Sequence, residues 1–537
     1  MNIPVTPFMW IMAVLPICLL LVLMVGLRWG AMKAAPFGVA VTVFTGVVFY
    51  KADLMLIALE SAKGAWSAMI ILIIVWTAVL LYQVGNEANA YRVIRDGMKR
   101  LLPNELLLIL ALGWIFESFL QGITGFGVPV AVGAPLLIGL GVKPLWAVII
   151  PLMGQSWGNT YGTLGAAWDA LTMTSGMTVG SEQYLATAFL AALLLWIWNA
   201  AIGLSICWFY GKGSGLKKGL PAVLVLSTLQ GGGELLMTQI NTTVACFIPA
   251  CLSLFGILIL GRTGLYGKPW SLEDSRIMER REPAEEDESE GSRMSLLQAI
   301  LPYILLSAIT LVVLMVGPVK NLLGSFKLSF SFPETVTGYG FVNEASEQFS
   351  PLSPFTHASM FLLISSLAGL FYYRTCGFIG EGGAKRVFQR TAKMARPSSI
   401  AVLALVIMSK IMSGTGQTVV LANGIAATLG NAYVALAPFI GMLGSFMTGS
   451  NMSSNILFGS FQTATAEILG VNNSMILGAQ TAGGSIGSAI SPSNIVLGTT
   501  TANILGREGD VLKRTGSIVI PMALVMGMIV FFSVGLS

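Results

Sequence analysis

The sequence predicts an all-α polytopic membrane protein of about 12 to 14 transmembrane helices, with inverted repeats and broken helices. Three observations lead to this fold class. Only 10% of the 537 residues are charged and 55% are hydrophobic, whereas about a quarter of the residues in soluble domains are charged. Apolar runs long enough to cross a bilayer recur from one end of the chain to the other. Two short motifs occur once in each half.

Each apolar run approaches the roughly 20 residues that cross a hydrocarbon layer of about 30 Å. The runs contain Gly and Pro, which membrane helices tolerate, and they lack the alternation of an outer-membrane barrel. They therefore predict helical spans. The runs are 8–27, 34–50, 66–84, 105–120, 128–150, 186–210, 241–260, 296–316, 358–373, 398–413, 432–447 and 515–535.

Basic residues gather in five loops, which the positive-inside bias places in the cytoplasm. These loops are 92–100, 212–218, 262–293, 374–396 and 507–514. Both chain termini are then expected outside. Residues 317–357 form the longest external loop, in which Leu328, Phe330 and Phe332 alternate with serines. This alternation predicts a short strand or a small hairpin.

We divide the chain into an N-terminal transmembrane half, a charged cytoplasmic linker and a C-terminal transmembrane half. The three parts are residues 1–261, 262–294 and 295–537. Within the linker, residues 273–290 are rich in acids and nearly without large apolar side chains, so we expect this stretch to be flexible. Each half contains one repeat core, at residues 105–210 and 432–535.

The cores share two motifs in the same order. SFLQG at 118–122 matches SFMTG at 445–449, and QSWGNTYG at 155–162 matches QTAGGSIG at 480–487. Chance similarity between Gly- and Ser-rich membrane helices is the simpler alternative, because small residues favour close helix packing in general.

The charge of the flanking loops tests the repeat independently. Residues 86–104, before the first core motif, contain four basic residues, and residues 417–431, before the second, contain none. After the motifs the pattern reverses, since residues 181–188 lack Lys and Arg and residues 507–514 contain three. The two cores are therefore expected in opposite orientations, as in many secondary transporters.

Polar, Gly-rich stretches interrupt the cores at 121–129, 154–165, 448–455 and 482–494. Such breaks are expected at bilayer depth only where they line a cavity or a site. A helix that restarts there presents free N–H groups and a positive dipole end, where an anion can bind. Each Ser or Thr taken singly also fits a packing role. The candidate substrate ligands are Gln121, Thr124, Gly125, Gly127, Ser156, Asn159, Thr160, Asn451, Ser453, Ser454, Asn455, Thr481 and Ser485.

Among the charged residues inside predicted spans, Lys410 and Glu117 are the two functional candidates, because an ionisable side chain deep in a membrane is functional by default. We expect Lys410 to neutralise a bound anion or to pair with Glu117, and an ion pair that only fixes helix packing is the alternative. Glu117 lies one helical turn before Gln121 and therefore on nearly the same face. It is the candidate proton-coupling group, and a structural role for it is equally open.

The chain resembles the lactate permease family, whose members carry L-lactate, D-lactate and glycolate with protons. The resemblance rests on GFGVP at 125–129, GLGVKPL at 139–145, TGSNMSSN at 448–455, QTA at 462–464 and the stretch 483–492. Two positions depart from the family pattern, because Gln121 and Asn451 stand where the family commonly has an acid. The stretch 155–167 is also unlike the usual family form. Substrate choice is therefore less firmly predicted than transport itself.

The resemblance implies a multi-pass secondary active transporter of a bacterial cytoplasmic (inner) membrane. Its expected cargo is L-lactate or a related small 2-hydroxy monocarboxylate, D-lactate or glycolate, taken up with protons. The alternative is a permease of the same fold for another small organic acid or anion, coupled to protons or to sodium. A homodimer remains open. We expect no metal, because the five cysteines show no metal-ligand spacing. We also expect no cofactor and no nucleic-acid partner.

Other classes fit the sequence less well. The single histidine, His357, leaves no partner set for an intramembrane Ser-His or zinc enzyme. No GxxxxGK[ST] loop is present for ATP. A channel remains an alternative, because broken helices also form selectivity filters. A channel cannot concentrate its substrate, so accumulation against a gradient distinguishes the two.

Overall fold

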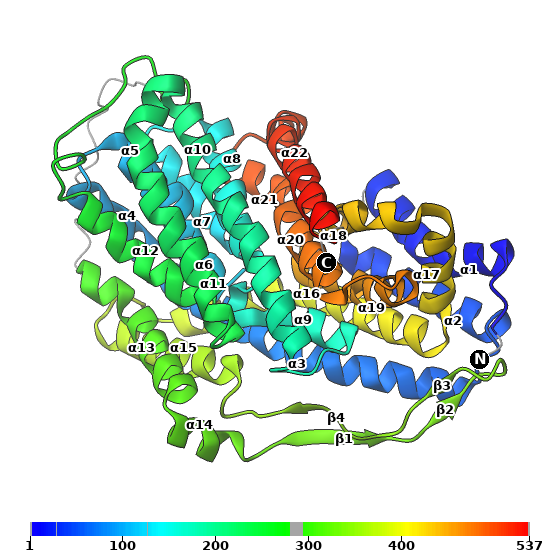
Figure 1. Ribbon diagram of the computed structural model, residues 1–537. Coiled ribbons are helices and arrows are strands. Elements are labelled where there is room, and N and C mark those ends of the chain that lie inside the picture. The colour runs from blue at the N-terminus through cyan, green and yellow to red at the C-terminus, as the bar shows by residue number, and fades with distance from the viewer. Residues whose placement is uncertain (1–2, 28, 126, 280–293, 535–537) are drawn as a thin grey trace.

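The computed structural model describes residues 3–27, 29–125, 127–279 and 294–534, and most of them lie in helices (Figure 1). Ten helical runs in this part of the chain are long and apolar enough to cross a membrane, judged by length and composition. The predicted all-α polytopic fold is confirmed. The count of ten is smaller than the predicted number of spans because the repeat cores contain short helices, such as α7 (Val128–Ile138).

The N-terminal half is helical throughout its described length. Its helices are α1 (Pro7–Leu21), η1 (Val22–Gly26), α2 (Ala31–Val48), α3 (Leu54–Glu87), α4 (Ala90–Leu101), α5 (Glu105–Leu110), η2 (Ala111–Ile115), α6 (Phe116–Ile123), α7, α8 (Pro144–Ser156), η3 (Trp157–Asn159), α9 (Gly162–Ser175), α10 (Glu182–Ser227), η4 (Thr228–Gly232), α11 (Gly233–Thr238), η5 (Thr242–Val244) and α12 (Phe247–Leu260).

The C-terminal half adds two small antiparallel sheets. Its elements are α13 (Leu296–Met315), α14 (Gly317–Gly324), β1 (Leu328–Phe332), β2 (Thr335–Val336), β3 (Val342–Asn343), β4 (Ser346–Leu352), α15 (Ala358–Thr375), α16 (Gly383–Gly414), α17 (Gln417–Leu429), η6 (Gly430–Ala432), α18 (Tyr433–Thr448), α19 (Asn451–Leu469), α20 (Asn473–Gly487), η7 (Ser488–Ile490), α21 (Pro492–Thr501) and α22 (Glu508–Val534).

Side-chain N-caps fix the start of several helices. Thr6 accepts a hydrogen bond from the Met9 backbone N–H at the start of α1, and Asp53 accepts one from Leu56 at the start of α3. These oxygens satisfy N–H groups that have no partner inside the helix. Ser295 and Gln298 form a reciprocal capping box at α13.

One of the predicted spans is wrong, and one further helix was missed. Residues 128–150 do not form one span but two helices, α7 and α8, because the chain turns at Gly141, which has a φ of +88°, and restarts at Pro144. The predicted span 186–210 is confirmed as the first part of a helical run from Glu182 to Thr238, in which the backbone leaves helical geometry at Gly211 and Lys212. The second part was missed because Lys217, Lys218 and Glu234 interrupt its apolar pattern.

The predicted strand in the external loop is confirmed. β1 pairs with β4, and β2 pairs with β3 nearer the tip of the hairpin. The hairpin runs alongside α3 toward the N-terminus (Figure 1). The indole N–H of Trp66 on α3 donates to the Ser350 carbonyl at 3.0 Å, and its ring meets Phe330 edge-on with centroids 4.7 Å apart. Aromatic packing and one hydrogen bond therefore hold the hairpin on the helix.

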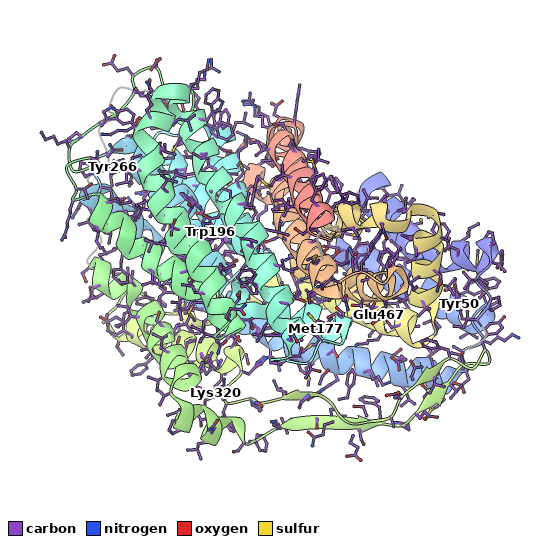
Figure 2. All side chains as sticks on the ribbon, in the orientation of Figure 1. Tyr50, Met177, Trp196, Tyr266, Lys320 and Glu467 are labelled. Carbon is purple, nitrogen blue, oxygen red and sulfur yellow. The ribbon has the colours of Figure 1, made fainter. Side chains whose placement is uncertain are left out.

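Contacts join several of the basic loops to each other or to neighbouring helices. Arg386 and Arg390 both pair with Glu87, at 2.7 and 2.8 Å, and the Arg514 guanidinium lies over the Trp146 ring at 4.9 Å. Tyr266, which donates to the Lys218 carbonyl at 2.7 Å, and Lys320 lie at opposite ends in Figure 2. These contacts fit the predicted cytoplasmic assignment.

We expected the linker to begin as a free segment at residue 273. Instead, residues 262–279 lie against the body. The Lys143 backbone N–H donates to the Ile277 carbonyl at 2.7 Å, and the Ser275 hydroxyl donates to the Tyr210 carbonyl. Ile277 is fully buried. The acid-rich part of the linker, residues 280–293, lies outside the described residues.

The orientation of the two cores predicts a labelling pattern. In a background with Cys18 and Cys376 replaced by Ser, we expect Arg100→Cys and Lys513→Cys to react with a membrane-impermeant maleimide only from the cytoplasmic side. Ala427→Cys, in the segment 417–431, should react only from outside, as should Lys320→Cys beside the hairpin. All four parent residues are exposed. Reaction of Ala427→Cys from the cytoplasmic side alone would contradict the inverted repeat.

The closest helix packing in the C-terminal half joins α18 and α20. A methyl group built on Gly441 would lie 1.9 Å from the Gln480 carbonyl oxygen, and one on Gly483 would lie 1.9 Å from the Pro438 carbonyl oxygen. Each glycine thus faces the backbone of the other helix. The small residues bring two broken-core helices into direct backbone contact, as glycines commonly do in membranes.

Candidate functional site

All four predicted helix breaks are present. The first core breaks between α6 and α7, where Gly125 and Gly127 have φ values of +60° and +77°. The second core breaks between α18 and α19 at Gly449, with φ +78°. Glycine adopts this left-handed region without the steric cost that other residues meet.

The second break in each core follows a short 3-10 segment. After η3 the backbone of Thr163, Leu164 and Gly165 has positive φ inside α9, so two non-glycine residues are held in a strained conformation. After η7 the chain is extended at Ser491 and α21 restarts at Pro492. Both cores therefore present a helix, a break, two helices, a 3-10 turn and a second break, in this order.

The segments that lead into these two second breaks lie against each other. The Ser485 hydroxyl donates to the Ser156 carbonyl at 2.6 Å, and the Thr160 hydroxyl donates to the Thr481 carbonyl at 3.2 Å. When QSWGNTYG is aligned with QTAGGSIG, Ser156 corresponds to Thr481 and Thr160 to Ser485. The two contacts are thus equivalent under exchange of the halves, as a local two-fold axis requires. The full inverted repeat stays a prediction.

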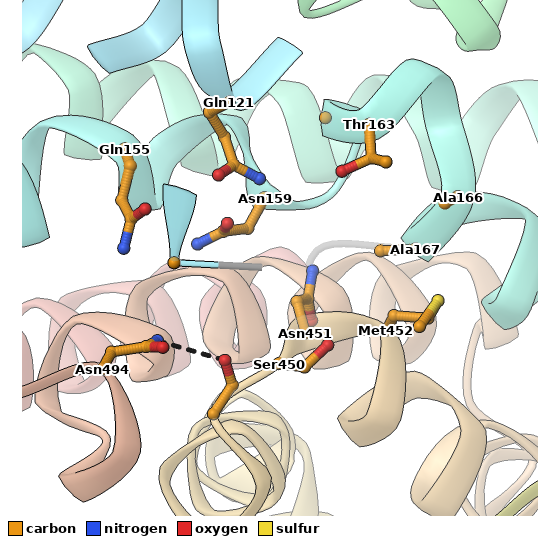
Figure 3. Close-up of a pocket in the computed structure, with 13 residues that line it drawn as sticks. Gln121, Gln155, Asn159, Thr163, Ala166, Ala167, Ser450, Asn451, Met452 and Asn494 are labelled. Carbon is orange, nitrogen blue, oxygen red and sulfur yellow. Dashed lines mark hydrogen bonds between the residues drawn. The ribbon is translucent and has the colours of Figure 1, made fainter. Parts of the chain in front are cut away.

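A pocket lies beside this crossing, between elements of both halves (Figure 3). Its cavity volume is about 30 Å³ in this conformation. None of the lining residues in the described part of the chain is charged. The lining residues are Gln121, Gly127, Gln155, Asn159, Gly162, Thr163, Ala166, Ala167, Gly449, Ser450, Asn451, Met452 and Asn494.

Amide groups from the two halves point into this pocket. Figure 3 shows Gln121 and Asn159 approaching from the first half and Asn451 from the second. The Asn451 amide donates to the hydroxyls of Thr160 and Thr481, at 3.1 and 3.2 Å, and its buried oxygen has no partner. An unpaired polar atom in a buried position is costly unless something binds it.

Thr481 connects this group to the next turn of α19. Its hydroxyl also accepts from the Asn455 amide at 2.9 Å, and Asn455 donates to the Ala167 carbonyl at 2.9 Å. Asn455 therefore joins α9, α19 and α20 behind the pocket. At the opposite wall, Asn494 donates to the carbonyls of Gly449 and Ser488. The amide side chains thus hold the broken backbone in place around the pocket.

The candidate ligands divide into three groups. Gln121, Gly127, Asn159 and Asn451 line the pocket. Ser156, Thr160, Thr481 and Ser485 form the crossing beside it, where their polar atoms are bonded within the protein. The remaining candidates lie in the same broken segments without lining it. They are Thr124, Gly125, Ser453, Ser454 and Asn455.

Sequence reasoning did not select nine lining residues, although most of them lie in the interrupted stretches. Gln155, Thr163 and Ser450 carry polar groups next to selected residues, and Asn494 ends the fourth stretch. Gln155 has a buried amide oxygen without a partner. The sequence located the interrupted stretches. Which of their residues line the pocket could be seen only in the fold.

Lys410 does not reach the pocket. Its ammonium donates to the Met173 carbonyl at 3.2 Å and lies 5.3 Å from the Phe349 ring centroid. It lies close enough to Glu60 for their charges to interact. The expected pair with Glu117 is absent among the described contacts, because Lys410 lies beneath the hairpin with the Glu60–Lys63 pair, whose N···O distance is 2.6 Å.

Glu117 is fully buried on α6, and neither carboxyl oxygen has a hydrogen-bond partner. Its Oε1 would lie 2.0 Å from a methyl group built on Gly133 of α7. The carboxyl group thus occupies space that only a glycine leaves free, where α6 packs against α7 beside the first break.

Together, the apolar helices, the broken cores and the uncharged pocket between them define a multi-pass membrane transporter rather than an enzyme. The profile of the L-lactate permease family matches residues 9–537. The chain belongs to the L-lactate permease family.

Curated relatives agree with this assignment. An L-lactate permease of Halalkalibacterium halodurans is 26% identical and covers 97% of this chain and 95% of its own length. An L-lactate permease of Escherichia coli is also 26% identical, over 94% of this chain and 92% of its own length. The glycolate permease GlcA of Escherichia coli is 25% identical, over 87% of this chain and 84% of its own length. These bacterial relatives indicate a bacterial membrane location.

A solved structure with some similarity is the YdaH transporter of Alcanivorax borkumensis. It is 12% identical, the match covers 90% of this chain and 88% of the YdaH chain, and the TM-score is 0.48.

Proposed function

We propose that this protein takes up L-lactate or a related small 2-hydroxy monocarboxylate, such as D-lactate or glycolate, together with protons. The observation that carries the proposal is the pocket in which amide groups of both halves converge. A 2-hydroxy acid presents a carboxylate and a neighbouring hydroxyl. Amide N–H groups can donate to the carboxylate, and amide oxygens such as that of Asn451 can accept from the hydroxyl.

The pocket also suits a single negative charge without a basic side chain. The α19 helix restarts at Asn451 directly beside the pocket, and N–H groups at a helix start favour an anion. The Asn159, Asn451 and Asn494 amides donate within the protein. Gln121 and Gln155 are therefore the lining amides whose N–H groups can turn to the substrate. A charged residue is not required to hold one carboxylate here.

We further propose that the chain works as two transmembrane halves, 1–261 and 295–537, joined by the linker 262–294, with inverted cores at 105–210 and 432–535. The paired contacts of Ser156 with Ser485 and of Thr160 with Thr481 support this arrangement. Movement of one core against the other would open the pocket to each side in turn. In this scheme Glu117, buried and unpaired, carries a proton.

Uptake by purified protein in liposomes tests the function. L-lactate, D-lactate, glycolate, pyruvate, a dicarboxylate and an alkanesulfonate are offered in parallel, with an inward proton gradient or an inward sodium gradient. We expect accumulation of the 2-hydroxy monocarboxylates, driven by the proton gradient. Preferred uptake of another anion, or dependence on sodium, would favour the alternative permease function, and equilibration without accumulation would indicate a channel.

A further inference from the structure

A second buried carboxyl group lies outside the pocket, in the part of the helical run that sequence analysis missed. Glu234 on α11 has no exposed surface, and neither of its oxygens has a hydrogen-bond partner. No salt bridge to Glu234 occurs among the described residues. In that part of the chain, Glu117 and Glu234 are the two buried carboxyl groups without a partner.

An ionised carboxylate in such a place is strongly unfavourable, because burial removes its hydration and nothing replaces it. Burial without a partner therefore favours the neutral, protonated form of Glu234. A carboxyl group retained only for packing would usually be paired or hydrogen-bonded. An unpaired acid inside a membrane-spanning run is by default a functional residue.

The local backbone of the two acids is the same. Glu117 and Glu234 each lie two residues after a five-residue π-helical segment, η2 and η4 respectively. Such segments widen the helix and occur often at functional sites. In η4 a methyl group on Gly231 would lie 2.3 Å from Cδ1 of Trp196, a residue of α10 labelled in Figure 2. The glycine allows the wider segment to pack against α10 and so sets the position of Glu234.

Glu234 is connected to the pocket wall through α12 and η3. The titratable groups that its charge affects are Tyr161 and Cys246. A methyl group built on Gly158 would lie 2.7 Å from the Cys246 sulfur and 3.5 Å from the side chain of the pocket residue Gln121. Asn159, in the segment 158–161, lines the pocket, so this segment lies between Cys246 and the pocket.

We propose that Glu234 is a second proton-binding group of the transport cycle, located behind the pocket wall formed by residues 158–161. It takes up one proton from water on the outer side and releases it to water on the inner side. In between, the proton keeps the buried carboxyl group neutral. The proposal rests on the proposed proton-coupled uptake and assigns part of that coupling to a residue that is not among the predicted ligands.

The test uses the full chain in liposomes and two measurements on each variant. The first is proton movement during net uptake of L-lactate, followed with a trapped pH-sensitive dye. The second is exchange of labelled for unlabelled L-lactate, which requires no net proton transfer. The variants are Glu234→Gln, Glu117→Gln and the control Glu182→Gln, at an exposed position in the first turn of α10.

We expect Glu234→Gln to retain exchange and to lose accumulation driven by the proton gradient, with at least a halving of protons moved per lactate. Glu182→Gln should match the parent in both measurements. Parent-like proton movement per lactate in Glu234→Gln would overturn the proposal. Absence of lactate exchange in the parent itself would instead contradict the proposed function.

A second variant covers the case in which Glu234→Gln does not fold. Glu234→Asp keeps an acid at the position but withdraws it by one methylene group. We expect proton-coupled uptake by this variant with a shifted dependence on pH. A pH dependence identical to that of the parent would count against Glu234 as a proton-binding group.

Discussion

Gly441→Ala should strongly destabilise the folded protein, because it adds a methyl group where two helices of the second core are in backbone contact. The new methyl group would lie 1.9 Å from the Gln480 carbonyl oxygen and 2.8 Å from the Gly484 backbone nitrogen. Neither atom belongs to a side chain that can rotate away, so α18 and α20 must separate. Overpacking of a closed core costs about 1 to 3 kcal/mol and occasionally more, and contact with backbone places this change at the upper end.

The measurement is the melting temperature and the monodisperse yield of purified protein in detergent. Gly483→Ala, which meets the Pro438 carbonyl from the other helix, should behave in the same way. Gly516→Ala on α22 is the matched control, because its methyl group would meet only Ile520 Cδ1, at 3.9 Å. If the melting temperature of Gly441→Ala equals that of the control, the backbone contact between α18 and α20 is not as close as described.

Asn451→Ala should raise the apparent substrate constant on the order of tenfold to a hundredfold. Asn451 lines the pocket, orients the hydroxyls of Thr160 and Thr481, and carries a buried oxygen without a partner. Without the Asn451 oxygen the buried substrate hydroxyl is left without an acceptor, which costs about 1 to 3 kcal/mol, and each 1.4 kcal/mol changes an equilibrium constant about tenfold.

Initial uptake rates in liposomes over a range of L-lactate concentrations give this constant. Asn321→Ala, at an exposed position on α14, is the control and should match the parent. Melting temperature measured in parallel separates loss of binding from loss of fold. An Asn451→Ala protein that folds and transports with the parent's constant would remove Asn451 from the substrate site.

The sequence was most informative about where helices break. Gly127 and Gly449 were expected at interruptions, since a break at bilayer depth requires residues that can leave helical geometry, and both line the pocket. Which polar groups face the pocket could not be read in this way. Asn451 bonds to Thr160, 291 positions away in the chain, and no local pattern contains such a contact.

Charged residues inside spans were harder to interpret. Lys410 was expected to neutralise a bound anion or to pair with Glu117, because a charge at that depth is costly alone. The fold gives Lys410 other neighbours, namely Glu60, the Met173 carbonyl and the Phe349 ring. Glu60 was not considered, because it precedes the apolar run from which the span was predicted. Periodicity and hydropathy locate a charge along the chain, whereas its partner depends on how helices pack.

The hairpin of the external loop limits how the two halves can move. Near its tip the Gly338 N–H donates to the Lys51 carbonyl at 2.9 Å, and the Asn343 amide donates to the Gly414 carbonyl at the end of α16 at 2.8 Å. Trp66 holds its other end on α3. As long as these bonds persist, the outer ends of α3 and α16 belong to one rigid body. The hinge that exposes the pocket to the outside must then lie between this body and the broken cores.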